Sequence, residues 1–404
     1  MRDAADSPAN SSSPDEPSRS ARATFDTSAG SVLHRIAGCC RTAAPGQAYP
    51  LTAIFLAAIA ITFVPLLVGA YLGPLSLTNS TAPHRLPFLR DWNVLFLYLV
   101  SFPSLAVLIV NDQWILSTSL KSVEQDGTLT LSEEHANQLR NLWEKRFRAV
   151  NWGAQIAGAA IGAVVAYFNY RIYVPASVGY WIAADGRLLA VGYIYLYCIF
   201  LFYCFVPIYI VRSAAIAFLL NDIVARAQLR MLPLHPDNAG GLQPMGHVGL
   251  RNQYLLTIFG LNIVILVAVS YHYLDVPPGL FGLIAAATIA YLILGPLTFV
   301  APLLPFRKRM LEAKTELMAD VARRMRLELQ RLHAQLKSGE ITEDDEKLVD
   351  RLRKIGAMID ELPVWPFDAL TIQKFFVAYI VPLVSSVGYP VATWLFDYFK
   401  DHFI

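Results

Sequence analysis

Long hydrophobic stretches alternate with shorter polar segments along most of the chain. Seven of these stretches are long enough, at about 1.5 Å per helical residue, to cross a hydrocarbon core of about 30 Å. The predicted spans are 51–72, 92–116, 150–168, 189–211, 254–274, 279–304 and 369–389. The pattern predicts an all-α integral membrane protein built as a seven-span helix bundle.

The longest polar segment, 306–368, separates the sixth and seventh predicted spans. Apolar residues recur in it at intervals of three and four, first from Met318 to Leu336 and then from Leu348 to Leu362. This spacing is typical of amphipathic helices, and the break between the two stripes predicts an antiparallel helical hairpin. Two interpretations remain open. The hairpin packs only on itself, or part of its apolar stripe binds another copy of the chain or a cytoplasmic protein.

Charge then sets the expected orientation. Hydrophobic residues make up 55% of the chain and charged residues 16%, and the net charge of +2 gives no reason to expect a nucleic-acid partner. The basic residues concentrate in alternate loops, above all between Arg307 and Lys374. The positive-inside rule therefore predicts an N-terminus inside and a C-terminus outside, as an odd number of spans requires. The hairpin is then cytoplasmic.

These features divide the chain into four regions. Residues 1–30 are rich in Ser, Pro, Ala and Asp, which predicts a disordered cytoplasmic tail. The transmembrane bundle with spans one to six occupies 31–305, and the hairpin occupies 306–368. The seventh span and an outer C-terminal segment follow in 369–404.

Two charged residues fall near the inner ends of predicted spans. Asp112 lies in the second span, and Arg212 interrupts the hydrophobic run of the fourth. Ionisable groups at membrane depth are costly and tend to be functional. The two side chains either pair with each other or reach the membrane surface separately.

A ridge of small residues marks the third span, where Ala154, Gly158, Gly162 and Ala166 stand four apart. Such a ridge lets two helix backbones approach closely. It predicts that this span is central in the bundle or lies at an interface between copies.

The polar stretch "PLHPDNAGGL", 233–242, joins the fourth and fifth spans and has three competing interpretations. It is a turn in which the prolines end a helix, Asp237 or Asn238 caps, and the glycines adopt positive φ. Alternatively, its backbone amides and nearby arginines bind an anion or a lipid headgroup. The candidate residues for that site are Arg226, Arg230, His235, Asp237, Asn238, Gly240, Gly241 and Arg251. A metal site of His235, Asp237 and His247 is the weakest interpretation, so no metal and no cofactor are assigned.

The pattern HPD-x-AGG-L in this stretch resembles a cytoplasmic loop of uncharacterised bacterial multi-pass membrane proteins. The stretch "PVWPFD", 363–368, adds to the resemblance. It covers only these two short stretches and implies no activity. It does imply a bacterial inner membrane as the location.

Three functions are compatible with these features. The first is an oligomeric channel-like or transport protein, assembled through the small-residue ridge and the hairpin. Its layout is similar to that of insect chemoreceptor channels, without their sequence motifs. The alternative is a membrane-anchored signalling or scaffold protein that acts through its hairpin. The third is a membrane-embedded enzyme with His235 as base and Asp237 as its orienting partner, although no catalytic set recurs beside them. The expected partners are the lipid bilayer, further copies of the chain and a cytoplasmic protein at the hairpin.

Overall fold

The computed structural model is a helical protein with two short two-stranded ladders. It describes residues 25–39, 51–73, 86–173, 181–184, 187–231, 235–237, 239–273, 278–338, 343–367, 372–377, 379–381 and 384. The α-helices are α1 (Val32–Cys39), α2 (Leu51–Leu72), α3 (Trp92–Phe96), α4 (Phe102–Gln125), α5 (Glu133–Tyr173), α6 (Ala190–Arg226), α7 (Gln243–Tyr273), α8 (Pro278–Val300), α9 (Leu304–Ser338) and α10 (Glu343–Asp360). A 3-10 turn, η1 (Phe88–Arg90), precedes α3, and a π-helical turn, η2 (Leu97–Ser101), joins α3 to α4. These helices confirm the all-α class.

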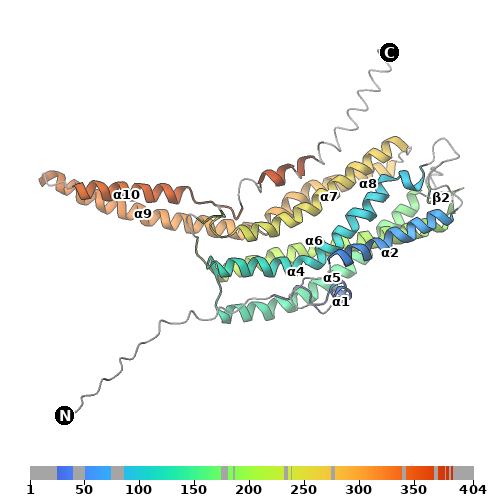
Figure 1. The fold of residues 1–404 in the computed structure, drawn as a ribbon, viewed down its shortest axis with the longest axis horizontal. Helices are drawn as coiled ribbons and strands as arrows, with labels where there is room; N and C mark the ends of the chain where they lie inside the picture. Colours follow the sequence, from blue (N-terminus) through green and yellow to red (C-terminus); the bar gives the residue numbers. More distant parts are fainter. Residues whose placement is uncertain are drawn as a thin grey trace, which may run out of the picture.

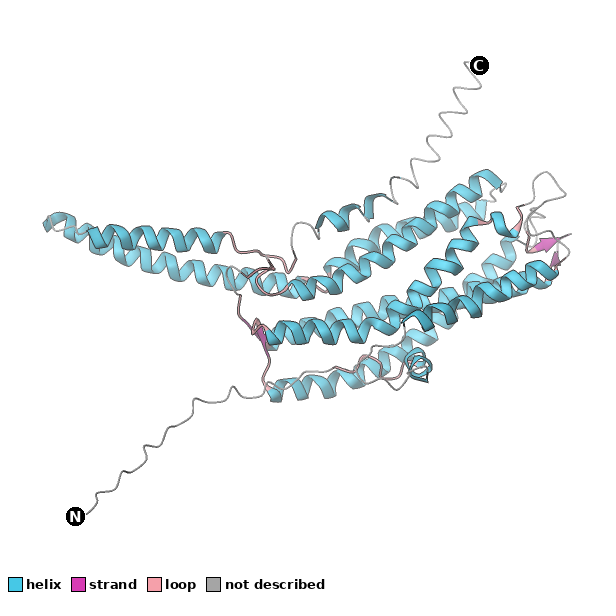
Figure 2. Cartoon of the chain, viewed as in Figure 1, coloured by secondary structure: helices cyan, strands magenta, loops and turns pink. Residues whose placement is uncertain are grey.

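The two ladders close loops at opposite ends of the bundle (Figure 2). Strand β1 (Leu129–Thr130) pairs antiparallel with β4 (Gln228–Leu229), which ties the loop after α4 to the loop after α6. Strand β2 (Ala183–Ala184) pairs antiparallel with β3 (Arg187–Leu188) just before α6. Each ladder therefore fixes where a long helix starts or ends.

Five of the described helices are long and apolar enough to cross a membrane: α2, the continuous stretch Trp92–Gln125, α5, α6 and α7. Helix α8 passes into α9 through a bend of 44°, and this pair counts as a sixth if it is one span. The chain is thus consistent with a polytopic integral membrane protein. Most of the seventh predicted span, 369–389, lies outside the described residues.

The spanning helices run side by side along the long axis of the molecule, and α9 and α10 project together beyond one end (Figure 1). Helix α5 lies along α6, and α7 lies along α8. Helices α5 and α6 are longer than the predicted spans. Each continues beyond its hydrophobic run toward the hairpin end of the bundle. The polar ends of these helices build the site described below.

Two hydrophobic clusters fill the bundle. The first joins α2, the stretch η2–α4 and α6, and it includes the fully buried Tyr98 and Leu105. The second lies toward the hairpin and joins α4, α5 and α6 to Phe306 and Met310 of α9. Buried Leu242 and Met245 add the start of α7 to this second cluster. The hairpin is thus anchored in the bundle.

The predicted hairpin is present as α9 and α10, which lie against each other. Lys314 donates hydrogen bonds to the Asp360 and Leu362 carbonyls, which fastens the base of the hairpin. Leu352 is 7% exposed, whereas Leu329 is 52% exposed. Part of the apolar stripe is therefore uncovered in the isolated chain. The turn at 339–342 lies outside the described residues.

The predicted disordered tail, 1–30, is wrong in its last six residues. Residues 25–30 fold against the bundle, with Phe25 at 5% and Thr27 at 0% exposure. Phe25 joins the second hydrophobic cluster, and the backbone beyond it finds hydrogen-bond donors on α5. The remainder, 1–24, lies outside the described residues.

The small-residue ridge packs within one chain, which corrects its expected role between copies. A Cβ added to Gly158 would lie 2.3 Å from the Cys204 carbonyl oxygen, and one added to Gly162 would lie 2.6 Å from that of Phe200. Ala154 is buried on the same ridge, and Ala166 is half-buried beside it. Because α6 already covers the ridge, no second copy can use it. The opposite side of α5 is exposed in the single chain.

Candidate functional site

A two-point ion pair joins α4 to α6 inside the bundle. Arg212 donates from Nε to Oδ2 of Asp112 at 2.8 Å and from Nη2 to Oδ1 at 2.8 Å. Arg212 is 1% exposed and Asp112 is 2% exposed. Of the two alternatives that the sequence left open, the structure shows the pair. Buried guanidinium–carboxylate pairs of this geometry are strongly directional, and removing one partner leaves an uncompensated charge.

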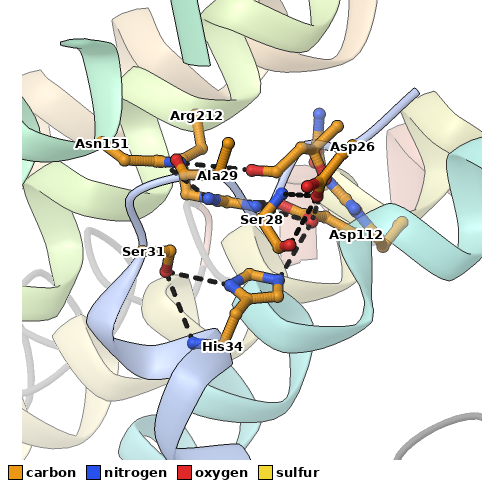
Figure 3. A network of polar contacts seen from close by, with 11 residues as sticks. Asp26, Ser28, Ala29, Ser31, His34, Asp112, Asn151 and Arg212 are labelled. Atoms are coloured by element: carbon orange, nitrogen blue, oxygen red, sulfur yellow. Dashed lines mark hydrogen bonds and ion pairs between the residues drawn. The ribbon is translucent and has the colours of Figure 1, made fainter. Parts of the chain in front are cut away.

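Asn151 of α5 extends the pair into a network that includes the N-terminal segment (Figure 3). Its Oδ1 accepts from Nη1 of Arg212 at 2.7 Å, and its Nδ2 donates to the Ala29 carbonyl at 2.7 Å and the Thr27 carbonyl at 3.2 Å. Thr27 closes the ring by donating from Oγ1 to Oδ1 of Asp112 at 3.2 Å. The segment is thus held by side chains from two long helices, α4 and α5, and Arg212 of α6 holds both of those side chains.

His34 of α1 lies beside the same carboxylate. Its Nε2 is 3.7 Å from Oδ1 of Asp112, and its Nδ1 is 2.9 Å from Oγ of Ser31 (Figure 3). The 3.7 Å separation is too long for a hydrogen bond. His34 is only 4% exposed, so its ring is enclosed in the bundle together with the ion pair.

A second buried guanidinium, that of Arg251, lies on α7. Its Nη2 donates to Oδ1 of Asn252 at 3.1 Å, and the same oxygen accepts from the Tyr209 hydroxyl at 2.7 Å. Tyr209 precedes Arg212 by one turn of α6, so the two polar groups face the same side of that helix. Asn252 also donates to the Thr298 carbonyl of α8 at 3.0 Å. The network therefore links α6, α7 and α8.

Arg251 differs from Arg212 in forming no direct ion pair with a described residue, although it lies near enough to Asp112 for the two charges to interact. Among the described residues it forms no salt bridge, its Nε has no hydrogen-bond partner, and it is 5% exposed. The buried carboxylates of the described chain are Asp91 and Asp112, and Asp91 caps α3 at the far end of the second span. This end of the bundle holds two buried guanidiniums and one buried carboxylate. An unpaired buried charge is costly, so this arrangement favours an anion beside Arg251.

The HPD stretch forms a turn organised by one carboxylate. Oδ1 of Asp237 accepts from the Ala239 amide at 2.9 Å and the Gly241 amide at 3.0 Å, and Oδ2 accepts from the Gln243 amide at 3.1 Å. Burial raises the pKa of this carboxyl, but the three amides and His235 outweigh it and lower the pKa below its ordinary value. The carboxylate thereby caps the start of α7.

Both glycines of this turn have a positive φ, and Gly241 also lies close to a neighbouring loop. Gly240 has φ +66° and Gly241 has φ +89°. A Cβ on Gly241 would lie 2.2 Å from Oγ1 of Thr128, in the loop after α4. The turn therefore packs directly against a second loop of the same end, which explains the paired glycines.

The predicted anion site at this loop needs correction residue by residue. The amides of Ala239 and Gly241 already donate to Asp237, so an added anion cannot use them. Arg226 and Arg230 are exposed, and Arg251 is buried within α7 instead of lining the loop. Asn238 lies outside the described residues. The structure moves the anion hypothesis from the loop to Arg251.

The catalytic and metal interpretations gain no support from the loop geometry. Nδ1 of His235 lies 2.7 Å from Oδ1 of Asp237, but that oxygen is already engaged by two amides. His247 is exposed on α7. In the described part of the chain, no three His, Cys, Asp or Glu side chains gather closely enough to hold a metal ion.

Five residues of this site were not predicted from the sequence: Thr27, His34, Asn151, Tyr209 and Asn252. Asn151 and Asn252 each lie at the boundary of a predicted span, where polar residues are common. One signal was present: "RNQ", 251–253, places three polar residues just before a hydrophobic run, and the helix continues through all of them. Comparison of the chain with models of protein families, with curated proteins and with solved structures found no match.

Proposed function

We propose that the chain is a membrane transport or channel-like protein that conducts a small anion. One observation carries the proposal: at one end of the bundle, the buried guanidiniums of Arg212 and Arg251 face a single buried carboxylate, that of Asp112. Ionisable residues buried within spans commonly line ion and substrate pathways. Because Asp112 is paired directly with Arg212, and Arg251 forms no salt bridge among the described residues, a mobile anion can serve as the direct partner of Arg251.

In this proposal the N-terminal segment acts as a closure on the hairpin side. Thr27 and Ala29 cover the ion pair and are bonded to Asp112 and Asn151, so their release would open the network to that side. The orientation proposed with it places this side in the cytoplasm, with the N-terminus inside and the C-terminus outside after a seventh span. The membrane proposed is a bacterial inner membrane, and the working form is a homo-oligomer.

The hairpin supports a second candidate function, that of a membrane-anchored scaffold. Leu329 and Ile355 are 52% and 45% exposed, and a shallow hollow of the α9 surface runs along Met325, Leu329 and His333. Apolar surface of this kind supports contact with a second copy or a cytoplasmic protein. Deleting 312–361 would separate the functions: a scaffold loses partner capture, whereas a transporter with an independent bundle retains flux.

Flux into proteoliposomes tests the transport function. Vesicles that contain the protein and a halide-quenched dye should lose fluorescence in an iodide gradient faster than empty vesicles. Arg251→Gln should abolish this difference because it removes the uncompensated charge. Arg146→Gln is the matched control, since Arg146 is a half-exposed arginine paired with Asp222 on the bundle surface.

Three results would overturn the proposal. Wild-type vesicles that match empty vesicles would rule out flux under these conditions and count against transport. Movement of sodium in place of iodide would contradict the anion class. Equal flux in Arg251→Gln and wild type would remove Arg251 from the path.

A further inference from the structure

A cavity of about 410 Å³ lies among α1, α2, α4, α5 and α6, and its lining includes Asn151, which accepts a hydrogen bond from Arg212. Most of its wall is aliphatic or aromatic, with Ala57 from α2, Ala106 from α4 and Phe205 from α6. A space of this size falls within the usual range of small-molecule sites, about 300–1,000 Å³. The cavity plays no part in the proposed anion path.

The cavity opens toward the outer surface of the spans. Two of its lining residues, Ile61 of α2 and Tyr197 of α6, are 52% and 49% exposed. Both belong to helices that are long and apolar enough to cross a membrane. In a bilayer this mouth faces hydrocarbon rather than water.

The amide side chains of Asn151 and Gln155 in the cavity wall have their N–H donors engaged within the protein. Nδ2 of Asn151 donates to two carbonyls, and its Oδ1 accepts from Arg212. Nε2 of Gln155 donates to the Gly30 and Asn151 carbonyls, and its Oε1 accepts from the Val32 amide. A headgroup or a polar metabolite would find no free donor there, and water would find too few partners to be held.

We propose that this cavity binds one acyl chain of a membrane lipid. An open mouth at the hydrocarbon, an apolar wall and amide side chains that are already engaged together favour a hydrocarbon tail over any polar ligand. The chain would enter between α2 and α6 and fill space that otherwise leaves side chains without packing partners. This inference is independent of the proposed transport function.

Binding of the chain also bears on the N-terminal segment. Ser31, Val32 and Leu33 form part of the cavity wall, next to the residues that Asn151 and Gln155 hold. A tail in the cavity therefore packs against the segment that covers the ion pair. Removal of lipid should weaken the docking of residues 25–33.

Photolabelling in nanodiscs tests the proposal. The probe is a phosphatidylcholine with a diazirine in the middle of one acyl chain, and labelled residues are mapped by mass spectrometry. Phe102, Ala106 and Val110 line the cavity yet are 3%, 3% and 0% exposed, so a chain on the outer surface cannot reach them. The wild type should be labelled at these buried positions.

A pair of variants on α2 provides the control. Ala57→Trp places an indole in the cavity, and Ala60→Trp places it at an exposed position outside the lining. Ala57→Trp should reduce labelling of the buried wall about tenfold, while Ala60→Trp should not, a difference of about 1.4 kcal/mol in affinity. Absence of label from the buried wall of the wild type overturns the proposal, whether or not the variants fold. Equal labelling in Ala57→Trp and wild type overturns it as well.

Discussion

Arg212 of α6 donates two hydrogen bonds of 2.8 Å to the carboxylate of Asp112 on α4, and both side chains are almost fully excluded from solvent. Asn151 and Thr27 add further bonds to the same two groups. The pair is therefore the junction at which two spans, the long helix α5 and the N-terminal segment meet. The nearby Arg251 has the same charge and is also buried, but it forms no salt bridge among the described residues.

Replacing the two buried arginines with glutamine should have different effects on the stability of the protein. Arg212→Gln leaves Asp112 buried without its cation and should destabilise the protein by about 3–5 kcal/mol. Arg251→Gln removes a charge that forms no salt bridge among the described residues, although it donates a hydrogen bond to Asn252, so it should leave stability nearly unchanged or raise it when no binding anion is present. Thermal unfolding in detergent measures both. Equal destabilisation by the two variants would show that Arg251 is paired in solution.

Asn151 should control the docking of the N-terminal segment. Asn151→Leu removes the donor for the Thr27 and Ala29 carbonyls and the acceptor for Arg212. Hydrogen exchange of residues 25–33 should rise toward that of an undocked segment. Gln138→Leu, on the exposed part of the same helix, should leave this exchange unchanged. Slow exchange in Asn151→Leu would mean that Phe25 and α1 hold the segment without it.

The close contact of α5 and α6 predicts opposite effects for two glycines on one helix. Gly158→Ala puts a Cβ 2.3 Å from the Cys204 carbonyl oxygen and should cost about 1–3 kcal/mol through backbone displacement. Gly153→Ala meets no atom within 4 Å and should stabilise α5 by about 0.5–1 kcal/mol. Unfolding midpoints of the two variants check the sign. A neutral Gly158→Ala would indicate that the helices lie farther apart.

Alanine should destabilise the protein at both glycines after Asp237, and more at Gly241 than at Gly240. Both have positive φ, so alanine costs about 1–2 kcal/mol at either position. Only at Gly241 does the new Cβ also collide with Thr128, whereas at Gly240 its nearest neighbour is the Met231 methyl at 3.5 Å. Gly241→Ala should therefore be the more damaging, and Thr128→Gly should partly rescue it. No rescue would place the cost in the backbone conformation alone.

Asp237 predicts a pH dependence of known sign. Its carboxyl pKa is lowered in the folded protein, so the folded state binds the proton less tightly than the unfolded chain. The stabilisation is therefore present above the ordinary carboxyl pKa of about 3.9 and is lost as pH falls through the lowered folded value. Melting temperatures between neutral pH and that range should fall less steeply in Asp237→Asn than in wild type. Parallel curves would mean that the three amide contacts do not depend on charge.

The five long apolar helices, the bent pair α8–α9 and the hairpin were predictable because each follows from a local pattern. Uninterrupted apolar runs predict helices that reside in hydrocarbon, and the stripe from Met318 onward predicts an amphipathic helix. The ion pair could be predicted as one of two alternatives, since Asp112 and Arg212 each interrupt an apolar run at similar depth. Their hydrogen-bond partners, Thr27 and Asn151, could not be predicted. Thr27 and Asn151 are 124 residues apart, and no local pattern specifies such a contact.

The burial of Arg251 also could not be predicted from the sequence. Its position suggested a membrane-surface arginine near the HPD loop, because the hydrophobic run begins only at Tyr254. In the folded chain α7 starts at Gln243, and packing against α6 and α8 buries the turn that contains Arg251. Hydrophobicity alone cannot reveal that burial, because it arises from neighbouring helices and not from the sequence around the residue.

The most direct test of the account is the effect of chloride on the melting temperature of the purified protein. Sodium chloride is compared with sodium gluconate at equal ionic strength, in wild type and in Arg251→Gln. If an anion neutralises Arg251, chloride should raise the wild-type melting temperature, with a stabilisation approaching about 2.7 kcal/mol at one hundred times the dissociation constant. The variant should melt at the same temperature in both salts. Equal melting of the wild type in both salts, or the same chloride effect in Arg251→Gln, would contradict the account.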